Sequence, residues 1–190
     1  MKRYKLYEPL PDSVIVNGKR VKIDLEYKNV LRMIDILSAD DLTPEAQEYL
    51  AMKCICRKPR KGMKAAVIGL LFPGVSEHDK ITDFEQDADL IRAAFRQVYG
   101  INLFKEKLHW FEFMCLLSCI PEGNRYGDVL SIRARPMPAA TPYNENERRW
   151  LARAKAEVGL HLTESERMEK YHRDVENIGA VLLALAGEGE

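Results

Sequence analysis

The stretch from Thr82 to Ile120 constrains the fold more than any other part of the chain, because its pattern predicts two amphipathic helices joined by a tight turn. Thr82 and Glu85 have the spacing of a capping box, which predicts that the first helix starts at Thr82. Gly100 stands where a left-handed C-terminal cap would end it. Between them, apolar residues recur at steps of three and four and define one helix face: Phe84, Ala88, Ile91, Phe95 and Val98.

The second helix of this pair is predicted to begin near residues 102–105 and to end at Ile120. Large apolar side chains lie on more than one side of it, and a helix that is hydrophobic nearly all round is a buried one. We therefore expect a central core helix in which Trp110 and Phe111 have a packing role. The fold class predicted is mainly α, a helical domain around a central buried helix pair, with an N-terminal two-stranded β-hairpin and a C-terminal helical arm.

The hairpin is predicted over Ser13 to Tyr27, since Asn17-Gly18 separates two runs of alternating apolar residues. Four further helices are predicted at 28–37, 43–57, 62–71 and 126–134. The start of the second of these is the most clearly marked, because Thr43 can cap it and Pro44 suits the first helical position.

Several segments of the central stretch resemble a known family. They are DFEQDAD at 83–89, Ala94-Phe95, YGINLF at 99–104 and LHW at 108–110. Together they are similar to the signature of a bacteriophage family named after gene product fifteen, over about Leu6 to Arg135. That family is encoded in the tail region of siphophages and related prophages, close to the tape-measure gene. The resemblance implies a tail assembly chaperone, and it transfers no catalytic or binding residue to this chain.

A linker is predicted at 136–143, because Pro136, Pro138 and Pro142 cannot continue a helix. It would join a hairpin plus helical core domain at 1–135 to a C-terminal helical arm at 144–190. The arm carries an apolar seam with steps of three and four, and we take it as a partner-binding hypothesis: Met168, Tyr171, Val175, Ile178, Leu182 and Leu185. The seam could equally pack on its own domain or on another chain.

The charge balance gives no overall attraction to nucleic acid or to anionic membranes, since 29 Lys and Arg residues face 29 Asp and Glu residues. A local basic cluster is interpreted as a solvated helix end, because no aromatic residues for base stacking alternate with it: Lys53, Arg57, Lys58, Arg60, Lys61 and Lys64. Nucleic acid is therefore an unlikely partner on this pattern. The N-terminal sequence lacks the apolar core of a signal peptide, and the longest apolar run is too short for a membrane helix. We expect a protein of the host cytoplasm.

No pattern typical of catalysis is present, and we expect neither an enzyme nor a cofactor. A zinc site of Cys54, Cys56, Cys115 and Cys119 is the alternative to free buried thiols, and the Cys-x-Cys spacing disfavours it. His109 could be a buried base, although such a histidine more often packs its ring and hydrogen-bonds a backbone group. The acidic residues at 83–89 suit the N-terminus of a helix better than a calcium loop.

Two functions are compatible with the sequence. The first is a non-enzymatic tail assembly chaperone that covers helical segments of the tape-measure protein or of other tail proteins, alone or as a homo-oligomer. The second is a structural virion component, such as a head–tail connector or tail-completion subunit.

Overall fold

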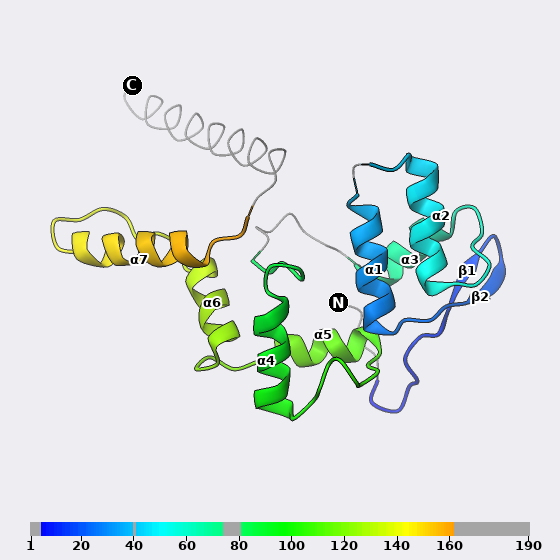
Figure 1. The fold of residues 1–190 in the computed structure, drawn as a ribbon, viewed down its shortest axis with the longest axis horizontal. Coiled ribbons are helices and arrows are strands. Elements are labelled where there is room, and N and C mark those ends of the chain that lie inside the picture. The colour runs from blue at the N-terminus through cyan, green and yellow to red at the C-terminus, as the bar shows by residue number, and fades with distance from the viewer. Residues whose placement is uncertain (1–4, 40, 74–80, 162–190) are drawn as a thin grey trace, which may run out of the picture. The chain divides into compact units, whose positions relative to one another are not determined.

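The computed structural model describes residues 5–39, 41–73 and 81–161, and the chain is mainly helical with a β-hairpin near its N-terminus (Figure 1). The predicted fold class is confirmed in these respects. Within the described ranges the elements are β1 (Ser13–Val16), β2 (Lys19–Lys22), α1 (Tyr27–Leu37), α2 (Pro44–Ile55), α3 (Met63–Leu71), α4 (Ala88–Tyr99), α5 (Trp110–Ser118), α6 (Arg125–Ala134) and α7 (Glu145–Val158). The chain divides into two compact units, Met1–Arg135 and Pro136–Glu190.

The hairpin forms at the predicted place. β1 pairs antiparallel with β2, and Val14 lies opposite Val21. Asn17 and Gly18 form the turn with φ of 49° and 73°, so both adopt the positive φ that a two-residue hairpin turn needs. Val14 and Val21 are buried, and β1 packs on α3. The hairpin therefore gains its stability from the helices beside it, as a two-stranded ribbon must.

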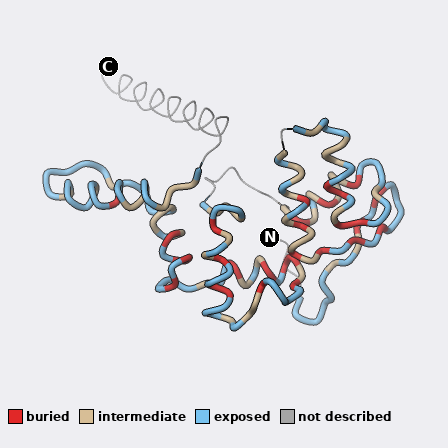
Figure 2. The backbone as a smooth tube through the Cα atoms, viewed as in Figure 1, coloured by how far each residue is buried: buried red, intermediate tan, exposed pale blue. Residues whose placement is uncertain are grey.

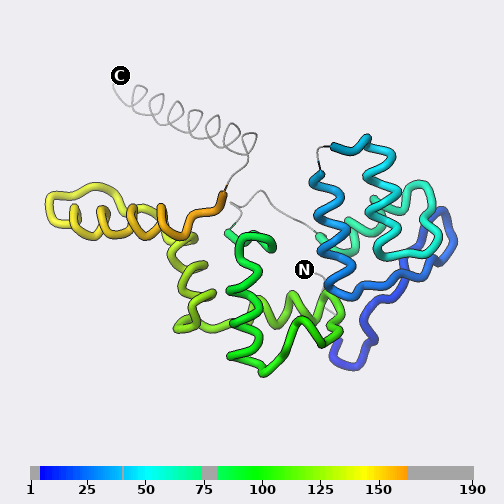
Figure 3. Tube along the Cα trace, in the orientation of Figure 1, coloured from blue at the N-terminus to red at the C-terminus, as the bar shows by residue number. Residues whose placement is uncertain are grey.

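α1, α2 and α3 form the first helical group. α1 and α2 pack against each other (Figure 3). The Thr43 hydroxyl accepts a hydrogen bond from the Ala46 N–H, and Pro44 occupies the first turn of α2, as predicted. Gly62, with φ of 81°, precedes α3 and lets the chain reverse direction after α2.

α4 begins at Ala88 with Asp87 at its N-cap position, five residues after the predicted cap at Thr82. Thr82 caps no helix, because its hydroxyl lies 3.0 Å from the Tyr126 hydroxyl. The residues before α4 form a separate turn held by Asp83, whose carboxylate accepts hydrogen bonds from two backbone N–H groups. The end of α4 is as predicted, since Gly100 adopts the left-handed conformation with φ of 69°.

α5 begins at Trp110, and the prediction of a start near 102–105 is wrong. The reason is a backbone bridge between Glu26 and His109, which keeps His109 extended. The Trp110 N–H donates to the Leu25 carbonyl at 2.7 Å, and the Tyr27 N–H donates to the Leu108 carbonyl at 3.0 Å. These bonds join the start of α1 to the start of α5.

An aromatic cluster forms the centre of the core. The ring of Phe113 lies within 4.6 Å of Tyr27, 5.3 Å of Phe95, 5.9 Å of Trp110 and 6.3 Å of Phe84, measured between ring centroids. Buried residues occur on α1, α4 and α5 (Figure 2). The prediction that Trp110 and Phe111 belong to the core is confirmed, and the central helix pair is α4 with α5.

The last two described helices follow turns that the sequence marks well. Asn124 caps α6 by accepting a hydrogen bond from the Tyr126 N–H. Asn144 precedes α7, and its side-chain amide accepts a hydrogen bond from the Thr141 N–H and donates one to the Ala139 carbonyl. No helix in the described ranges combines the length and the hydropathy needed to cross a bilayer.

Candidate protein-binding cleft

The loop between α4 and α5 presents one aromatic side chain to solvent. The side-chain oxygen of Asn102 accepts a hydrogen bond from the Phe104 N–H, and the backbone carbonyl of Asn102 accepts one from the Lys105 N–H. This turn directs Leu103 into the core, while the Phe104 side chain is 74% exposed. Single exposed apolar side chains are common on protein surfaces, so the surroundings of Phe104 decide whether it belongs to a contact surface.

Phe104 stands at the edge of a cleft between α1 and α4. The cleft has a volume of about 260 Å³, and its apolar lining includes Tyr27, Leu103 and Phe113. The Tyr27 hydroxyl donates to the Leu103 carbonyl at 2.5 Å, and its ring stacks on Phe113. Because these residues are buried and joined to the core, the base of the cleft is fixed by the fold.

Three cations surround this apolar base. Lys28 donates to the carbonyls of Phe104 and Glu106, each at 3.3 Å. The Arg92 guanidinium lies 4.9 Å from the centre of the Phe104 ring. Arg32 is exposed and forms no ion pair with any described residue. The cleft thus offers an apolar base with three cations at its rim, although Lys28 lies 3.9 Å from Glu26 and Arg92 lies 2.6 Å from Asp89.

Asp35 is the acidic residue among those that line the cleft. Burial raises the pKa of its carboxyl above the ordinary value, and the nearby carboxylates of Glu85 and Asp83 raise it further. A negative charge at Asp35 is therefore less favourable than at an isolated surface position. An incoming cation from a partner would relieve this repulsion.

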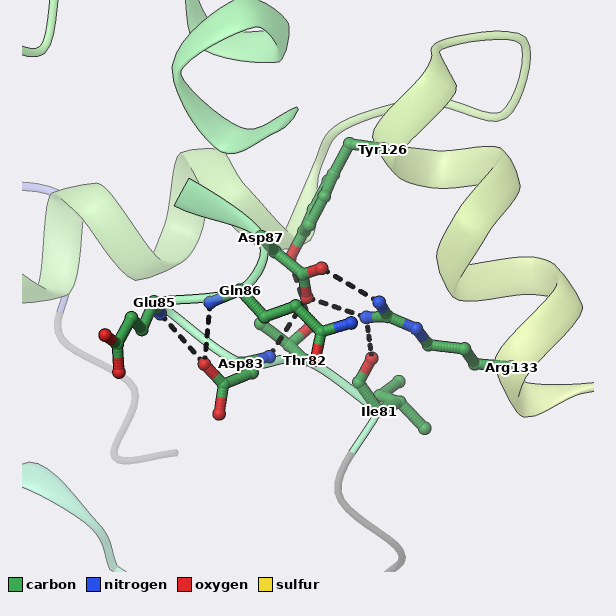
Figure 4. A network of polar contacts seen from close by, with 8 residues as sticks. All are labelled: Ile81, Thr82, Asp83, Glu85, Gln86, Asp87, Tyr126 and Arg133. Carbon is green, nitrogen blue, oxygen red and sulfur yellow. Dashed lines mark hydrogen bonds and ion pairs between the residues drawn. The ribbon is translucent and has the colours of Figure 1, made fainter. Parts of the chain in front are cut away.

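The turn before α4 positions another side of the cleft. The Asp83 carboxylate accepts hydrogen bonds from the N–H groups of Glu85 and Gln86 at 2.9 Å each (Figure 4). The Asp83 N–H donates to the Asp87 carboxylate at 3.0 Å. Phe84, between these anchors, lines the cleft and contacts the aromatic core.

A buried ion pair fastens this turn to α6. Arg133 donates to both oxygens of Asp87, at 2.7 and 2.9 Å, and to the Ile81 carbonyl at 3.0 Å (Figure 4). The side chains of Arg133 and Asp87 are 7% and 1% exposed. Burial raises the pKa of the neighbouring Tyr126 phenol. Both Asp87 oxygens are engaged, so the pair has a positioning role for the start of α4.

Of the carboxylates at 83–89, those of Asp83 and Asp87 take part in this turn, and that of Asp89 in α4 pairs with Arg92 at 2.6 Å. No group of three or more His, Cys, Asp or Glu residues in the described ranges could hold a metal ion. His109 has the packing role: its Nδ1 accepts from the Phe111 N–H, and its Nε2 lies 3.1 Å from the Pro11 carbonyl.

The four cysteines are free, but their burial differs from the prediction. Cys56 is buried and Cys54 is partly buried, whereas Cys115 and Cys119 are exposed. Cys115 lies on the side of α5 away from Phe113, and Cys119 is the C-cap residue that follows the helix. Although apolar residues lie on all sides of α5, one side of the helix is therefore exposed to solvent.

The predicted partner-binding seam lies outside the described residues, which end at residue 161. Its members are Met168, Tyr171, Val175, Ile178, Leu182 and Leu185. The cleft, in contrast, was not anticipated from the sequence. Its lining comes from α1, α4, α5 and two loops, so no single periodic segment identifies it, although the exposed Phe104 falls within a family-like run.

Comparison with protein families gives a match that covers the central part of the chain. The sequence profile described as "Bacteriophage Gp15 protein" matches residues 59–160. The resemblance was expected to extend from about Leu6 to Arg135. The matched range begins later than this and ends beyond Arg135, so that it includes α7. No curated protein and no solved structure gives a significant match to the chain. Because the profile covers more than half of the sequence, the chain belongs to the Bacteriophage Gp15 protein family.

Proposed function

We propose that the protein is a non-enzymatic tail assembly chaperone that acts in the host cytoplasm and binds helical segments of the tape-measure protein. Membership of its family indicates a phage structural or morphogenesis protein that interacts with other phage proteins. The proposal adds the client and the mode of action. The observation that carries it is the cleft beside Phe104, a surface suited to apolar side chains of another polypeptide.

The dimensions of the cleft support binding of anchor side chains. Its volume of about 260 Å³ is slightly below the ~300 Å³ at which pockets for drug-sized ligands begin. One or two bulky side chains of an amphipathic helix would occupy it, with α1 and α4 on either side. Helix-in-groove recognition uses such anchors at i, i+3 or i+4.

Charge at the rim supports a preference among helices. Lys28, Arg32 and Arg92 favour a client whose apolar anchors are flanked by Asp or Glu. Such a helix would be covered until assembled tail subunits replace the chaperone. The same chemistry suits weak, reversible binding, since most of the attraction at exposed cations is screened by salt.

The test is co-purification of the protein with fragments of a tape-measure protein, followed by a measured dissociation constant. Phe104→Ser is expected to weaken binding by about 2 kcal/mol, or roughly thirtyfold, as for an aromatic side chain that becomes buried when the client binds. Tyr49→Ser is the matched control, because Tyr49 is 55% exposed and does not line the cleft. Equal binding by both variants would contradict the role of the cleft.

Mass spectrometry of purified virions separates this function from the alternative. A chaperone is expected to be missing from mature particles. Detection of the protein in fixed copy number would instead favour a structural virion component, such as a connector or tail-completion subunit.

A further inference from the structure

The outer face of the hairpin carries cations around an exposed aliphatic side chain. Ser13 and Ile15 of β1 lie opposite Lys22 and Arg20 of β2, and these pairs share the face turned away from Val14. Ile15 is 69% exposed. No acidic residue occurs from 13 to 23. This face is therefore positive, with an apolar centre.

A second positive segment joins α2 to α3. Arg57, Lys58, Arg60 and Lys61 are exposed, and no acidic residue occurs from 49 to 76. None of these four side chains forms an ion pair with a described residue. The same holds for the cations of the hairpin. Surface cations that form no ion pair with a described residue, in a segment without acidic residues, indicate a local excess of positive charge.

The fold brings these two segments together. The Asp24 N–H, just after β2, donates to the carbonyl of Ile55 at the end of α2, at 2.7 Å. β1 also packs on α3, directly after the loop of cations. In Figure 1 the hairpin and the connection between α2 and α3 lie at the same end of the unit. We name the joint surface of Arg20, Lys22, Arg57, Lys58, Arg60, Lys61 and Ile15 the basic face.

We propose that the basic face binds an acidic polypeptide segment that carries an aliphatic side chain among its Asp and Glu residues. Carboxylates would pair with the cations of the hairpin and the loop, and the aliphatic side chain would pack on Ile15. This surface is separate from the cleft, whose lining includes none of its residues. It therefore gives the protein a second binding site, independent of the proposed function.

Polypeptide fits this face better than nucleic acid. None of the residues that define it is aromatic, whereas binding of single strands relies on stacking of bases on aromatic rings. A two-stranded ribbon can enter the major groove of DNA, so duplex DNA is the competing ligand that the experiment must include. Ile15 at the centre would face a phosphate backbone without an apolar partner, but it matches an aliphatic side chain.

The experiment measures binding of full-length protein to a fluorescent glutamate-rich peptide that contains leucines, by anisotropy at low and at moderate salt. Binding is expected at low salt and should weaken as the screening length falls to about 10 Å at 0.1 M. The double variants Arg57→Glu/Arg60→Glu and Arg20→Glu/Lys22→Glu are each expected to weaken binding about tenfold or more, because each replaces attraction with repulsion. Thermal melting checks that both remain folded.

Matched controls separate the basic face from net charge. Lys105→Glu/Lys107→Glu makes the same change in charge at two exposed positions outside the face and should leave binding unchanged. Ile15→Ser should weaken binding of the leucine-containing peptide but not of pure polyglutamate. Phe104→Ser should bind the peptide normally, which distinguishes this surface from the cleft. Wild-type binding by both charge-reversal variants, or tighter binding of duplex DNA than of the peptide, would overturn the proposal.

Discussion

Replacement of Arg133 by methionine is expected to destabilise the fold by about 3 kcal/mol, at the lower end of the ~3–5 kcal/mol typical for a broken buried ion pair. The variant removes both hydrogen bonds to Asp87 and the one to the Ile81 carbonyl. It leaves a carboxylate that is 1% exposed, with the Asp83 N–H as its remaining hydrogen-bond donor at 3.0 Å. That donor is the reason to expect the lower value.

The free energy of unfolding would be measured by urea denaturation followed by far-UV circular dichroism, with a parallel thermal melt. At roughly 2–4 °C per kcal/mol for a protein of this size, the melting temperature should fall by about 6–12 °C. Arg92→Met is the matched control, because the Arg92–Asp89 pair is of the same kind but its side chains are 42% and 97% exposed. The control should cost less than about 1 kcal/mol. Equal losses for the two variants would refute the argument from burial.

Three further predictions concern single side chains. Gly18→Val should destabilise the fold by at least about 1–2 kcal/mol, because Gly18 has a φ of 73° that a branched side chain resists. Nothing lies within 4 Å of a Cβ built at this position, so the cost comes from the backbone conformation and not from a clash. Unchanged denaturation would show that the turn is misassigned. Trp110→Ala should cost about 3–5 kcal/mol by denaturation, since the side chain is 1% exposed, and full stability would exclude its core role. Tyr126→Phe should cost about 1 kcal/mol at neutral pH through loss of the Thr82 contact. Because burial raises the pKa of Tyr126, the folded state retains the phenol proton above the unfolded value of about 10, so wild-type stability should fall there as pH rises and the variant should fall less.

The elements predicted well from the sequence are those fixed by neighbouring residues. Asn17-Gly18 permits positive φ at both turn positions, and Thr43-Pro44 supplies both the cap and the first helical residue of α2. In such cases a few adjacent residues decide the local conformation, and the rest of the fold does not oppose it. The end of α4 at Gly100 follows the same logic.

The errors arose where distant residues decide. Thr82 and Glu85 have capping-box spacing, yet Tyr126 and Arg133 on α6 hold this segment in a different turn. A start of α5 at Trp110 depends on the bridge between His109 and Glu26, 83 residues earlier in the sequence. Long-range contacts of this kind override local helix propensity, and spacing within a short segment contains no sign of them.

The candidate surfaces were beyond prediction for a related reason. The cleft requires knowledge of which faces of α1 and α4 meet, and Phe104 reads as one more apolar residue of a core helix. The basic cluster of the α2–α3 region was visible in the sequence, but its union with the hairpin cations depends on the contact between β1 and α3. Periodicity identifies the buried face of a helix, not the neighbours that cover it.

The backbone bonds between residues 25–27 and 108–110 have a consequence for synthesis on the ribosome. The Trp110 N–H and the Leu108 carbonyl complete the bridge to Leu25 and Tyr27, and Phe113 completes the aromatic cluster around Tyr27. In a nascent chain, Tyr27 and the part of α1 that packs on α5 therefore lack this partner until α5 has left the exit tunnel, although α2 can already cover the rest of α1. At about 5–20 residues per second, the interval between the emergence of α1 and that of α5 lasts several seconds. During this interval the first three helices and the hairpin must remain soluble without the partner that completes their core.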